Sequence, residues 1–560
     1  DGVDNHNTRQ LKVSILLELG RWNELEPFLQ SELSKKNDRG APNLMSAAQL
    51  AAGLESPTTM PLVRASLAKG DENPQLYLAA YNIALSLGVE QTAEVNAWLN
   101  FALDHSTEDG PVYSKDIDDA VEFMRDAKER HQKLNSMILA GELPLSLAAS
   151  PLNATLSSIY LGQAWANRQS TDPRKHNLIP AFAGNRLLWN LPGNPVVSFD
   201  VTSLLTLQSV GVLDRVVGSF QRVVLPAGTL SQIFQDFSSA RHPQPSRVTQ
   251  ARQLTQLIAA QTLTLDPCQR DSSELEDQVG AEFARLYDAA RDADGYVIDT
   301  APLHPPGKLK ETVDPKPFED RLVSPKGLIK QLKVDGVFSD VLADEAMASV
   351  IGSGEEWPNE PKVAENRPLY LTMIASHYLS DAGLLPKLKS VFGKLVILTD
   401  VEELAKREIE QSSMASAVRA ELEGLTQSLA TALEAGSVTI GRLTADRSTD
   451  SEDDVQERDI GPLFNALNDV SDAEIFVCDD RALNKNGTFN DKRGTLINTA
   501  LSFDILRYLE MNGTITSSEY DASIEKLYES GFALIPLDPQ RVMDSACASN
   551  WEVGPNAALR

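Results

Sequence analysis

Short apolar runs recur through the last two-thirds of the chain, and each is followed by a longer helical pattern. The first two runs are 196–199 and 223–225, and the stretch 201–210 between them has a helical pattern. Short apolar strands that alternate with helices are typical of an α/β fold with a parallel sheet. The pattern therefore predicts this fold class for the last two-thirds of the chain.

The strand and helix pattern occurs twice in the same order, and Gly211 of the first copy corresponds to Gly383 of the second. The predicted strands are 196–199, 223–225, 263–265 and 296–298 in the first copy, and 369–371, 395–398, 438–440 and 475–478 in the second. A shared order with nearly constant spacing indicates duplication of a whole domain. We therefore predict two modules, 190–351 and 365–545, that superpose as two copies of one fold.

Residues 8 to about 145 show helical patterns throughout. Gly20, Gly53 and Gly88 lie near the ends of predicted helices and about 34 residues apart, which is close to the period of tetratricopeptide repeats. This region, residues 1–185, resembles a degenerate array of such repeats. An irregular all-helical domain is the alternative interpretation.

If the helices form such an array, they should pair antiparallel and stack into a short superhelix. We expect Tyr77, Tyr81 and Trp98 to pack between helices. The surface of a helical-repeat array commonly binds a protein partner, so we expect a partner there.

Composition excludes several classes of protein. The three cysteines form no CxxC pair and the seven histidines no HExxH motif, so neither a disulfide framework nor a zinc site is expected. The sequence contains no apolar run of about 20 residues and no signal peptide, so we expect no membrane association and a cytoplasmic location. Because the first residue is not Met, we expect a fragment of a longer protein.

The net charge of −28 argues against broad electrostatic binding of nucleic acid, which requires clustered Lys and Arg. Any contact with nucleic acid should therefore be local or mediated by a metal ion.

Acidic residues follow several of the predicted strands. Asp200 follows the first strand, Asp299 follows the fourth strand of the first copy, and Asp479 and Asp480 follow the fourth strand of the second. Ligands gather at the carboxyl ends of parallel strands, where neighbouring carboxylates repel one another unless a cation or proton neutralises them. An all-oxygen cluster suits Mg²⁺ or Mn²⁺, which could activate water for phosphodiester cleavage.

Each acid also has a purely structural interpretation. Asp200 could cap the helix that follows it, and Asp479 with Asp480 could do the same. Asp299 before Thr-Ala-Pro could begin a turn. Glu402 and Glu403 lie in a first helical turn, where acids interact favourably with the helix dipole.

The order of these motifs resembles a known family. Asp200-Val-Thr-Ser-Leu-Leu, a helix, and then Val-Val-Leu-Pro226-Ala-Gly-Thr resembles the opening of a PIN nuclease domain. The segment Phe-Val-Cys-Asp479-Asp480-Arg-Ala-Leu resembles the late acidic strand end of that family. Together with the helical repeats, the chain is similar to bacterial PIN proteins that accompany tetratricopeptide and Gre-factor C-terminal-like domains, a group of conflict-system nucleases.

The resemblance implies a metal-dependent ribonuclease with several carboxylates in one pocket. The first acid of the family falls on Asp200 in module one and on Thr372 in module two. The second and the late acids fall on the following positions: Asp236 (one turn after Ser231-Gln232) and Asp299 in module one, and Glu402 or Glu403 and Asp479 or Asp480 in module two. Neither copy has the full set. A metal site is expected to centre on Asp200 with Asp299 and Asp236, with a mainly structural second copy.

Two functions follow from these expectations. The first is a Mg²⁺- or Mn²⁺-dependent endoribonuclease of a bacterial defence or stress-response system, with RNA as its substrate. The second is a non-catalytic protein-interaction scaffold built from degenerate PIN folds.

Overall fold

The computed structural model describes residues 5–551 except for a set of short segments and one long one. The segments outside the description are 71, 108–109, 113–116, 185–188, 269–272, 307–310, 351–353, 442–472, 492–493, 537–538 and 549. None of the described helices is both long enough and apolar enough to cross a lipid bilayer.

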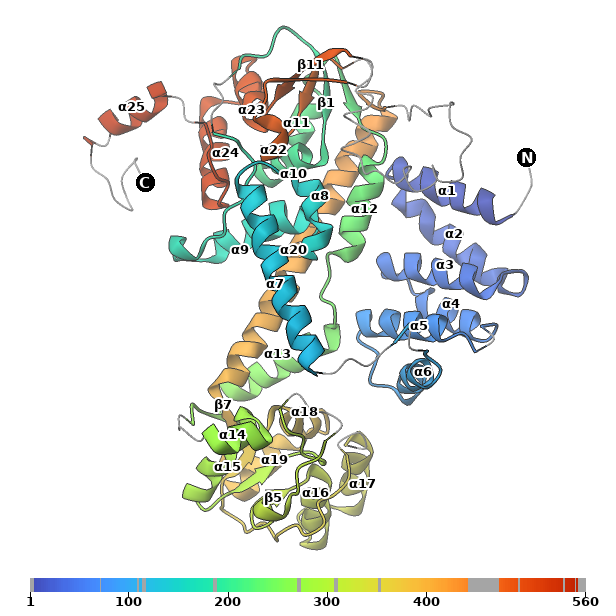
Figure 1. The fold of residues 1–560 in the computed structure, drawn as a ribbon, viewed down its shortest axis with the longest axis vertical. Helices are drawn as coiled ribbons and strands as arrows, with labels where there is room; N and C mark the ends of the chain where they lie inside the picture. The colour runs from blue at the N-terminus through green and yellow to red at the C-terminus, as the bar shows by residue number, and fades with distance from the viewer. Residues whose placement is uncertain are drawn as a thin grey trace.

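The first part of the chain forms paired helices that stand as a column beside the rest of the molecule (Figure 1). These helices are α1 (His6–Glu18), α2 (Leu25–Ser34), α3 (Ala41–Gly53), α4 (Thr59–Leu67), α5 (Pro74–Ser86) and α6 (Ala93–Asp104), with short 3-10 turns η1 (Trp22–Glu24) and η2 (Lys36–Asp38). Helix α3 packs on α4, and α5 packs on α6. Trp98 is buried, Tyr81 is partly buried against the same core, and the Tyr77 ring lies 4.1 Å from that of Phe101. The expected packing of the aromatics between helices is therefore found.

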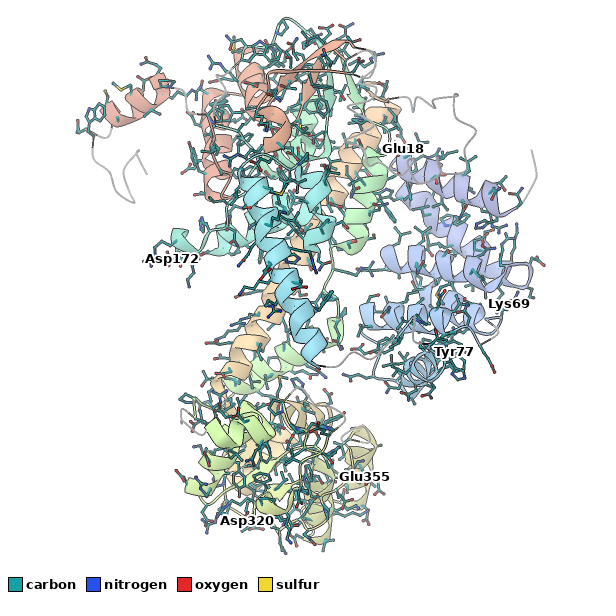
Figure 2. All side chains as sticks on the ribbon, viewed as in Figure 1. Glu18, Lys69, Tyr77, Asp172, Asp320 and Glu355 are labelled. Carbon is teal, nitrogen blue, oxygen red and sulfur yellow. The ribbon has the colours of Figure 1, made fainter. Side chains whose placement is uncertain are left out.

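The column contacts the second part of the molecule near Glu18 (Figure 2). The Glu18 carboxylate accepts hydrogen bonds from Gly228 N at 2.6 Å and from Ser231 Oγ at 2.9 Å, both at the start of α12. The Trp22 ring lies edge-on to Phe234 at 5.1 Å. The column is thus attached to α12 by both polar and aromatic contacts.

One long helix and several short helical elements connect the column to the sheets. They are α7 (Ile117–Leu139), α8 (Leu145–Ala148), η3 (Ser150–Leu152), η4 (Ser158–Gly162, a π-helical turn), α9 (Gln163–Gln169) and η5 (Pro173–Lys175). Leu145, Leu156 and Tyr160 from this segment are buried in the same apolar core as the first sheet.

The first sheet has six strands in the order β10-β11-β9-β1-β2-β8. All neighbours are parallel except the pair β10 and β11. Its strands are β1 (Val196–Phe199), β2 (Arg222–Leu225), β8 (Val438–Ile440), β9 (Ile475–Val477), β10 (Thr488–Asn490) and β11 (Leu496–Ala500).

The second sheet has five parallel strands in the order β3-β7-β6-β4-β5 and a separate apolar core. Its strands are β3 (Thr264–Asp266), β4 (Tyr296–Ile298), β5 (Leu322–Val323), β6 (Leu369–Leu371) and β7 (Leu395–Leu398), with η6 (Lys316–Phe318) before β5. The prediction of parallel α/β sheets after a helical region is confirmed.

The remaining helices follow, most of which cover the sheets or connect them. They are α10 (Val201–Val210), α11 (Leu213–Val217), α12 (Thr229–Ser239), α13 (Pro245–Ala259), α14 (Ser273–Val279), α15 (Ala281–Asp292), α16 (Pro325–Val334), α17 (Asp340–Ser349), α18 (Met373–Asp381), α19 (Leu385–Phe392), α20 (Thr399–Glu434), α22 (Arg481–Asn484), α23 (Ser502–Met511), α24 (Ser517–Glu529) and α25 (Pro539–Ala548).

Each sheet takes strands from both predicted modules, so the predicted module boundaries do not separate the two sheets. The six-stranded sheet takes β1 and β2 from module 190–351 but takes β8, β9 and β11 from module 365–545. The five-stranded sheet takes β3, β4 and β5 from the first module and β6 and β7 from the second. The two sheets arrange their strands in the same order. When the five-stranded sheet is read from β5 to β3, its order β5-β4-β6-β7-β3 matches β11-β9-β1-β2-β8 of the six-stranded sheet. The two sheets thus share a strand order, but neither predicted module forms a sheet of its own.

The length of α20 explains this arrangement. It runs for 36 residues without interruption between β7 and β8, and at 1.5 Å per residue it spans about 54 Å. Strands that pair in one sheet lie ~5 Å from their neighbours, so β8 cannot return to the sheet that holds β7. Helix α13 packs along α20, and together they form the arm that joins the two sheets in Figure 1.

Candidate active site

Three acids from the two predicted modules meet at the carboxyl edge of the six-stranded sheet. Asp200 directly follows β1, and Asp479 and Asp480 follow β9, which pairs with β1 in parallel with Phe199 opposite Val477. We refer to Asp200, Asp479 and Asp480 as the strand-end acids. Because the two strands are neighbours, this pairing brings together acids that the sequence assigned to separate modules.

Asp200 is held by the start of the helix that follows it. Its Oδ1 accepts a hydrogen bond from Ser203 N at 2.9 Å, so Asp200 caps α10 as its structural interpretation predicts. The Thr202 hydroxyl donates to Asp200 Oδ2 at 2.7 Å and accepts from Asp479 N at 3.0 Å. Thr202 therefore links the ends of β1 and β9. Burial raises the pKa of the Asp200 carboxyl above its ordinary value.

Asp479 is fully buried and only partly satisfied. Its Oδ1 accepts a hydrogen bond from Ser502 N at 3.0 Å. Its Oδ2 is buried without a hydrogen-bond partner among the residues that the structure describes. Burial is the main cause that raises the pKa of Asp479 to about 6, and the charge of Asp200 adds to the rise. A buried carboxylate oxygen without a partner is energetically costly, and sites that bind ligands accumulate such atoms.

Asp480 has both carboxylate oxygens engaged by main-chain donors. Oδ1 accepts from Ala482 N at 2.9 Å and Oδ2 from Leu145 N at 2.6 Å. Burial raises the pKa of Asp480 to about 7, and the nearby Asp200 carboxylate also raises it, while the two N–H donors oppose the rise.

Asp236 on α12 lies in the same pocket as Asp200. Its Oδ2 accepts from Ser157 N at 2.8 Å and its Oδ1 from Gln232 Nε2 at 2.8 Å. Burial raises the pKa of this carboxyl. Both oxygens of Asp236 are therefore already engaged.

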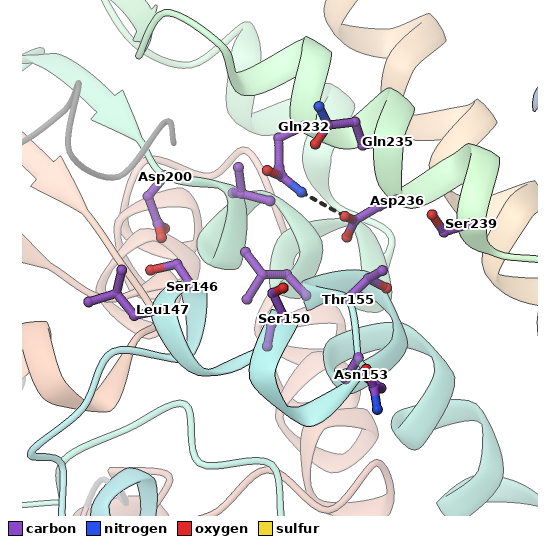
Figure 3. A pocket seen from close by; sticks show the side chains of 14 residues that line it. Ser146, Leu147, Ser150, Asn153, Thr155, Asp200, Gln232, Gln235, Asp236 and Ser239 are labelled. Atoms are coloured by element: carbon purple, nitrogen blue, oxygen red, sulfur yellow. Dashed lines mark hydrogen bonds between the residues drawn. The ribbon is translucent and has the colours of Figure 1, made fainter. Parts of the chain in front are cut away.

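The pocket has a volume of about 470 Å³ and lies between two walls of different origin (Figure 3). One wall comes from Ser146, Leu147, Ala149, Ser150, Asn153, Ala154, Thr155 and Leu156, and the other from Asp200, Val201, Gln232, Gln235, Asp236 and Ser239. Half of these side chains are neutral and polar, and most of the others are apolar. Asp200 and Asp236 are the carboxylates that line the pocket.

The acids do not fit a divalent cation in this arrangement. Their all-oxygen chemistry suits Mg²⁺ or Mn²⁺. However, no three His, Cys, Asp or Glu side chains among the described residues lie close enough together to hold a metal ion. Main-chain N–H groups also engage oxygens that a cation would need, notably on Asp236 and Asp480.

The corresponding edge of the five-stranded sheet has a different composition. Asp299 follows β4 and lies beside Thr372, which follows β6 and donates its hydroxyl to Asp299 Oδ1 at 2.7 Å. Thr300 N donates to the same oxygen at 2.8 Å. Burial raises the pKa of Asp299 to about 7, and the charge of Glu282 contributes.

These positions correct the expected metal site. Asp299 belongs to the five-stranded sheet and Asp200 to the six-stranded sheet, so the expected grouping of these two residues is wrong. Glu402 and Glu403 lie in the first turns of α20 and pair with Lys406 at 2.8 Å and Arg407 at 3.8 Å. The two glutamates thus form ion pairs along the helix.

Several contacts at the site have no signal in the sequence. The donors from Leu145 and Ser157 to the acids are main-chain N–H groups, which every residue except proline carries. Glu282 accepts from Met373 N at 2.7 Å beside the second sheet edge. Its place on the amphipathic helix α15 gives only a weak signal.

Comparison with known proteins adds one finding. A model of the family described as HTH_upstream_double_PIN matches residues 117–186. No curated protein and no solved structure matches the chain. The matched region contains α7, α8 and α9, and it lies within the residues 1–185 for which the sequence predicts helical repeats. The match indicates a PIN-associated domain at residues 117–186.

Proposed function

We propose that this chain is a PIN-type endoribonuclease with its active site at the strand-end acids of the six-stranded sheet. The observation that carries the proposal is that Asp200, Asp479 and Asp480 meet at the ends of adjacent parallel strands. The match to a PIN-associated domain at 117–186 supports it independently. A bacterial defence or stress-response role in the cytoplasm, with a protein partner on the helical column, belongs to the same proposal.

The chemistry of the acids suits phosphodiester hydrolysis. A carboxyl group with a pKa near 7, such as that of Asp480, can take up or release a proton at neutral pH. The proposed cofactor is Mg²⁺ or Mn²⁺, which would stabilise the charge of the phosphate and activate water. Either ion would have to displace the hydrogen bonds that Asp200 and Asp480 accept, whereas Asp479 Oδ2 has no partner among the described residues.

The test is cleavage of single-stranded RNA with and without Mn²⁺. We expect cleavage by the unchanged chain, a loss of at least about a hundredfold in Asp200→Asn and Asp480→Asn, and full activity in Asp299→Asn. Asp299→Asn is the matched control, because it removes a buried acid that follows a strand of the other sheet. If Asp299→Asn abolished cleavage while Asp200→Asn did not, the site would be assigned to the wrong sheet.

A non-catalytic scaffold is the second candidate function. Thr372 replaces the first acid at the second sheet edge, and the described residues contain no ready metal site. The net charge of −28 also disfavours an extended RNA-binding surface. If the unchanged chain cleaved no RNA with either Mg²⁺ or Mn²⁺, the scaffold function would be favoured.

A further inference from the structure

The pocket beside the strand-end acids, which we refer to as the acid pocket, offers little attraction to an anion. Asp200 and Asp236 are its charged side chains, and neither Lys nor Arg lines it in the part of the chain that the structure describes. These carboxylates repel a phosphate group that approaches them, because like charges oppose one another at short range. Attachment of an RNA strand therefore calls for a cationic group outside the acid pocket.

A second pocket of about 440 Å³ lies where the helical column meets the end of α12, and we refer to it as the column pocket. Ser238 lines the column pocket, and the next residue, Ser239, lines the acid pocket (Figure 3). Asp236 and Ser238 lie two residues apart on α12, which is about 3 Å along the helix axis. The two pockets are therefore neighbours at the last turn of one helix.

The column pocket differs from the acid pocket in its charge. None of the described residues that line it is Asp or Glu. Its polar side chains come from both parts of the molecule: Gln49 on α3, Gln75, Asn82 and Ser86 on α5, Ser238 on α12, and Arg241 just after α12. The amides of Gln49, Gln75 and Asn82 are exposed and have no hydrogen-bond partner among the described residues. Because an amide can both donate and accept, these side chains suit the edges of unpaired bases and the ribose hydroxyls.

Arg241 is held in place, but its charge is not neutralised. Its Nε donates to Ser238 O at 2.9 Å and its Nη2 to Ala52 O at 2.5 Å, near the ends of α12 and α3. Among the described residues, Nη1 has no hydrogen-bond partner and no carboxylate forms an ion pair with Arg241. Burial lowers the pKa of Arg241 and the charge of Arg419 lowers it further, while Glu55 opposes the change. Glu55 pairs with Arg419 at 3.4 Å, so one carboxylate serves two guanidinium groups and the position attracts an anion.

We propose that the column pocket binds the backbone of a single-stranded RNA substrate, with Arg241 on a phosphate and the neutral amides on the adjoining nucleotide. The inference rests on the proposed function in taking RNA as the ligand. A guanidinium group suits this role because it donates to phosphate oxygens from a fixed plane and stays charged when partly buried. A single local contact also agrees with the net charge of −28, which disfavours an extended basic surface. The helical column thus positions the RNA strand beside the acid pocket.

The test is binding of a fluorescein-labelled single-stranded RNA of about ten nucleotides to the full chain, measured by fluorescence anisotropy in EDTA. EDTA removes divalent cations, so binding is measured apart from cleavage. Arg241→Gln should weaken binding by about tenfold or more and reduce the slope of log affinity against log salt by about one. Arg64→Gln, which removes an exposed arginine of α4 paired with Glu94 at 2.9 Å, is the control and should leave the salt slope unchanged. A purely structural effect of Arg241→Gln would lower the affinity without changing this slope.

A second pair of variants covers the case in which Arg241→Gln does not fold. Asn82→Asp adds a carboxylate to the column pocket, and Asn96→Asp makes the same change at an exposed position of α6 that does not line the pocket. Asn82→Asp should bind the RNA at least about fivefold more weakly than Asn96→Asp. Equal affinity of these two variants, or an unchanged salt slope in folded Arg241→Gln, would overturn the proposal. If Asn82→Asp instead lost binding of a labelled Glu-rich peptide and kept binding of RNA, the occupant would be a protein and the proposal would be wrong.

The two proposals can fail separately. If the unchanged chain binds RNA through Arg241 but cleaves none with Mn²⁺, the ribonuclease function fails and the RNA site in the column pocket stands. If Asn82→Asp and Asn96→Asp cleave RNA with the same KM as the unchanged chain, the RNA site fails and the function stands.

Discussion

Buried acids that are kept from water by their neighbours are the main electrostatic feature of this chain. Asp299 is an example, since it is buried and accepts hydrogen bonds from Thr372 and Thr300 on a single oxygen. Its pKa is about 7 in the folded chain against 3.8 as the ordinary value. Between these pH values the unfolded chain releases a proton that the folded chain retains. Stability is therefore lost as pH rises from about 4 to 7.

The substitution Asp299→Asn should remove this loss of folding stability at high pH. The amide oxygen of asparagine can accept both hydrogen bonds, because both go to Oδ1. We expect the free energy of unfolding at pH 8 to rise by about 2–4 kcal/mol, with little change at pH 4. Denaturant unfolding at the two pH values measures the difference. Asp277→Asn, at an exposed position on α14, is the control that makes the same charge change and should alter stability by less than about 0.5 kcal/mol. An equal increase in the free energy of unfolding at both pH values would contradict the raised pKa of Asp299 as the cause.

The helix α20 determines the architecture, and its composition suits its length. It contains no proline and a single glycine, Gly424, which is exposed in the C-terminal third of the helix. Glycine in a helix interior costs about 0.5–1 kcal/mol relative to alanine. A Cβ at Gly424 would meet only the end of the Gln208 side chain, at 3.4 Å.

Gly424→Ala should therefore stabilise the chain by about 0.5–1 kcal/mol, measured as a shift in the denaturant midpoint. Gly436, just after the helix, makes the matched comparison because its φ of +76° is left-handed. Gly436→Ala should destabilise the chain by about 1–2 kcal/mol. A loss of stability in Gly424→Ala would show that α20 is not a continuous helix at this point.

The hydrophobic pattern predicts most elements but not which strands pair. The runs at 196–199 and 369–371 become strands as predicted, because short apolar runs between helices have few other buried conformations. The pattern does not predict this pairing because β9 and β4 are similar apolar strands, each followed by an acid, so β1 has two nearly equivalent candidate partners. The signal that distinguishes them is the unbroken helical stretch 399–434, since a helix of that length excludes pairing within one copy.

The candidate site could be predicted only in part for the same reason. Asp200, Asp479 and Asp480 were identified as strand-end acids, and they lie at strand ends. Their grouping depends on the pairing of β1 with β9, which the pattern of residues does not encode. The contacts from Leu145 and Ser157 to the acids depend on main-chain donors, which the sequence does not mark.

The molecule as a whole is one chain in which each sheet needs both copies. If the chain is cut between Glu365 and Asn366, an exposed turn, neither piece holds all strands of either sheet. We expect residues 1–365 and 366–560 to copurify as a one-to-one complex when produced together. Each piece alone should lack a cooperative thermal transition by circular dichroism. Two pieces that fold separately and do not associate would show a tandem arrangement instead.

The strand content of the two sheets also determines the order in which the chain can fold during synthesis. The five-stranded sheet uses residues 264 to 398 only, so it can close while the C-terminal part is still unmade. Strands β1 and β2 leave the ribosome earlier, yet their partners β8 and β9 follow only after residue 438. Strands β1 and β2 are therefore made first but stay unpaired with β8 and β9 until late in synthesis. Their unpaired edges are exposed to chaperones and to other chains during that time. Synthesis that stalled within α20 would release a chain with a complete five-stranded sheet and an incomplete six-stranded sheet.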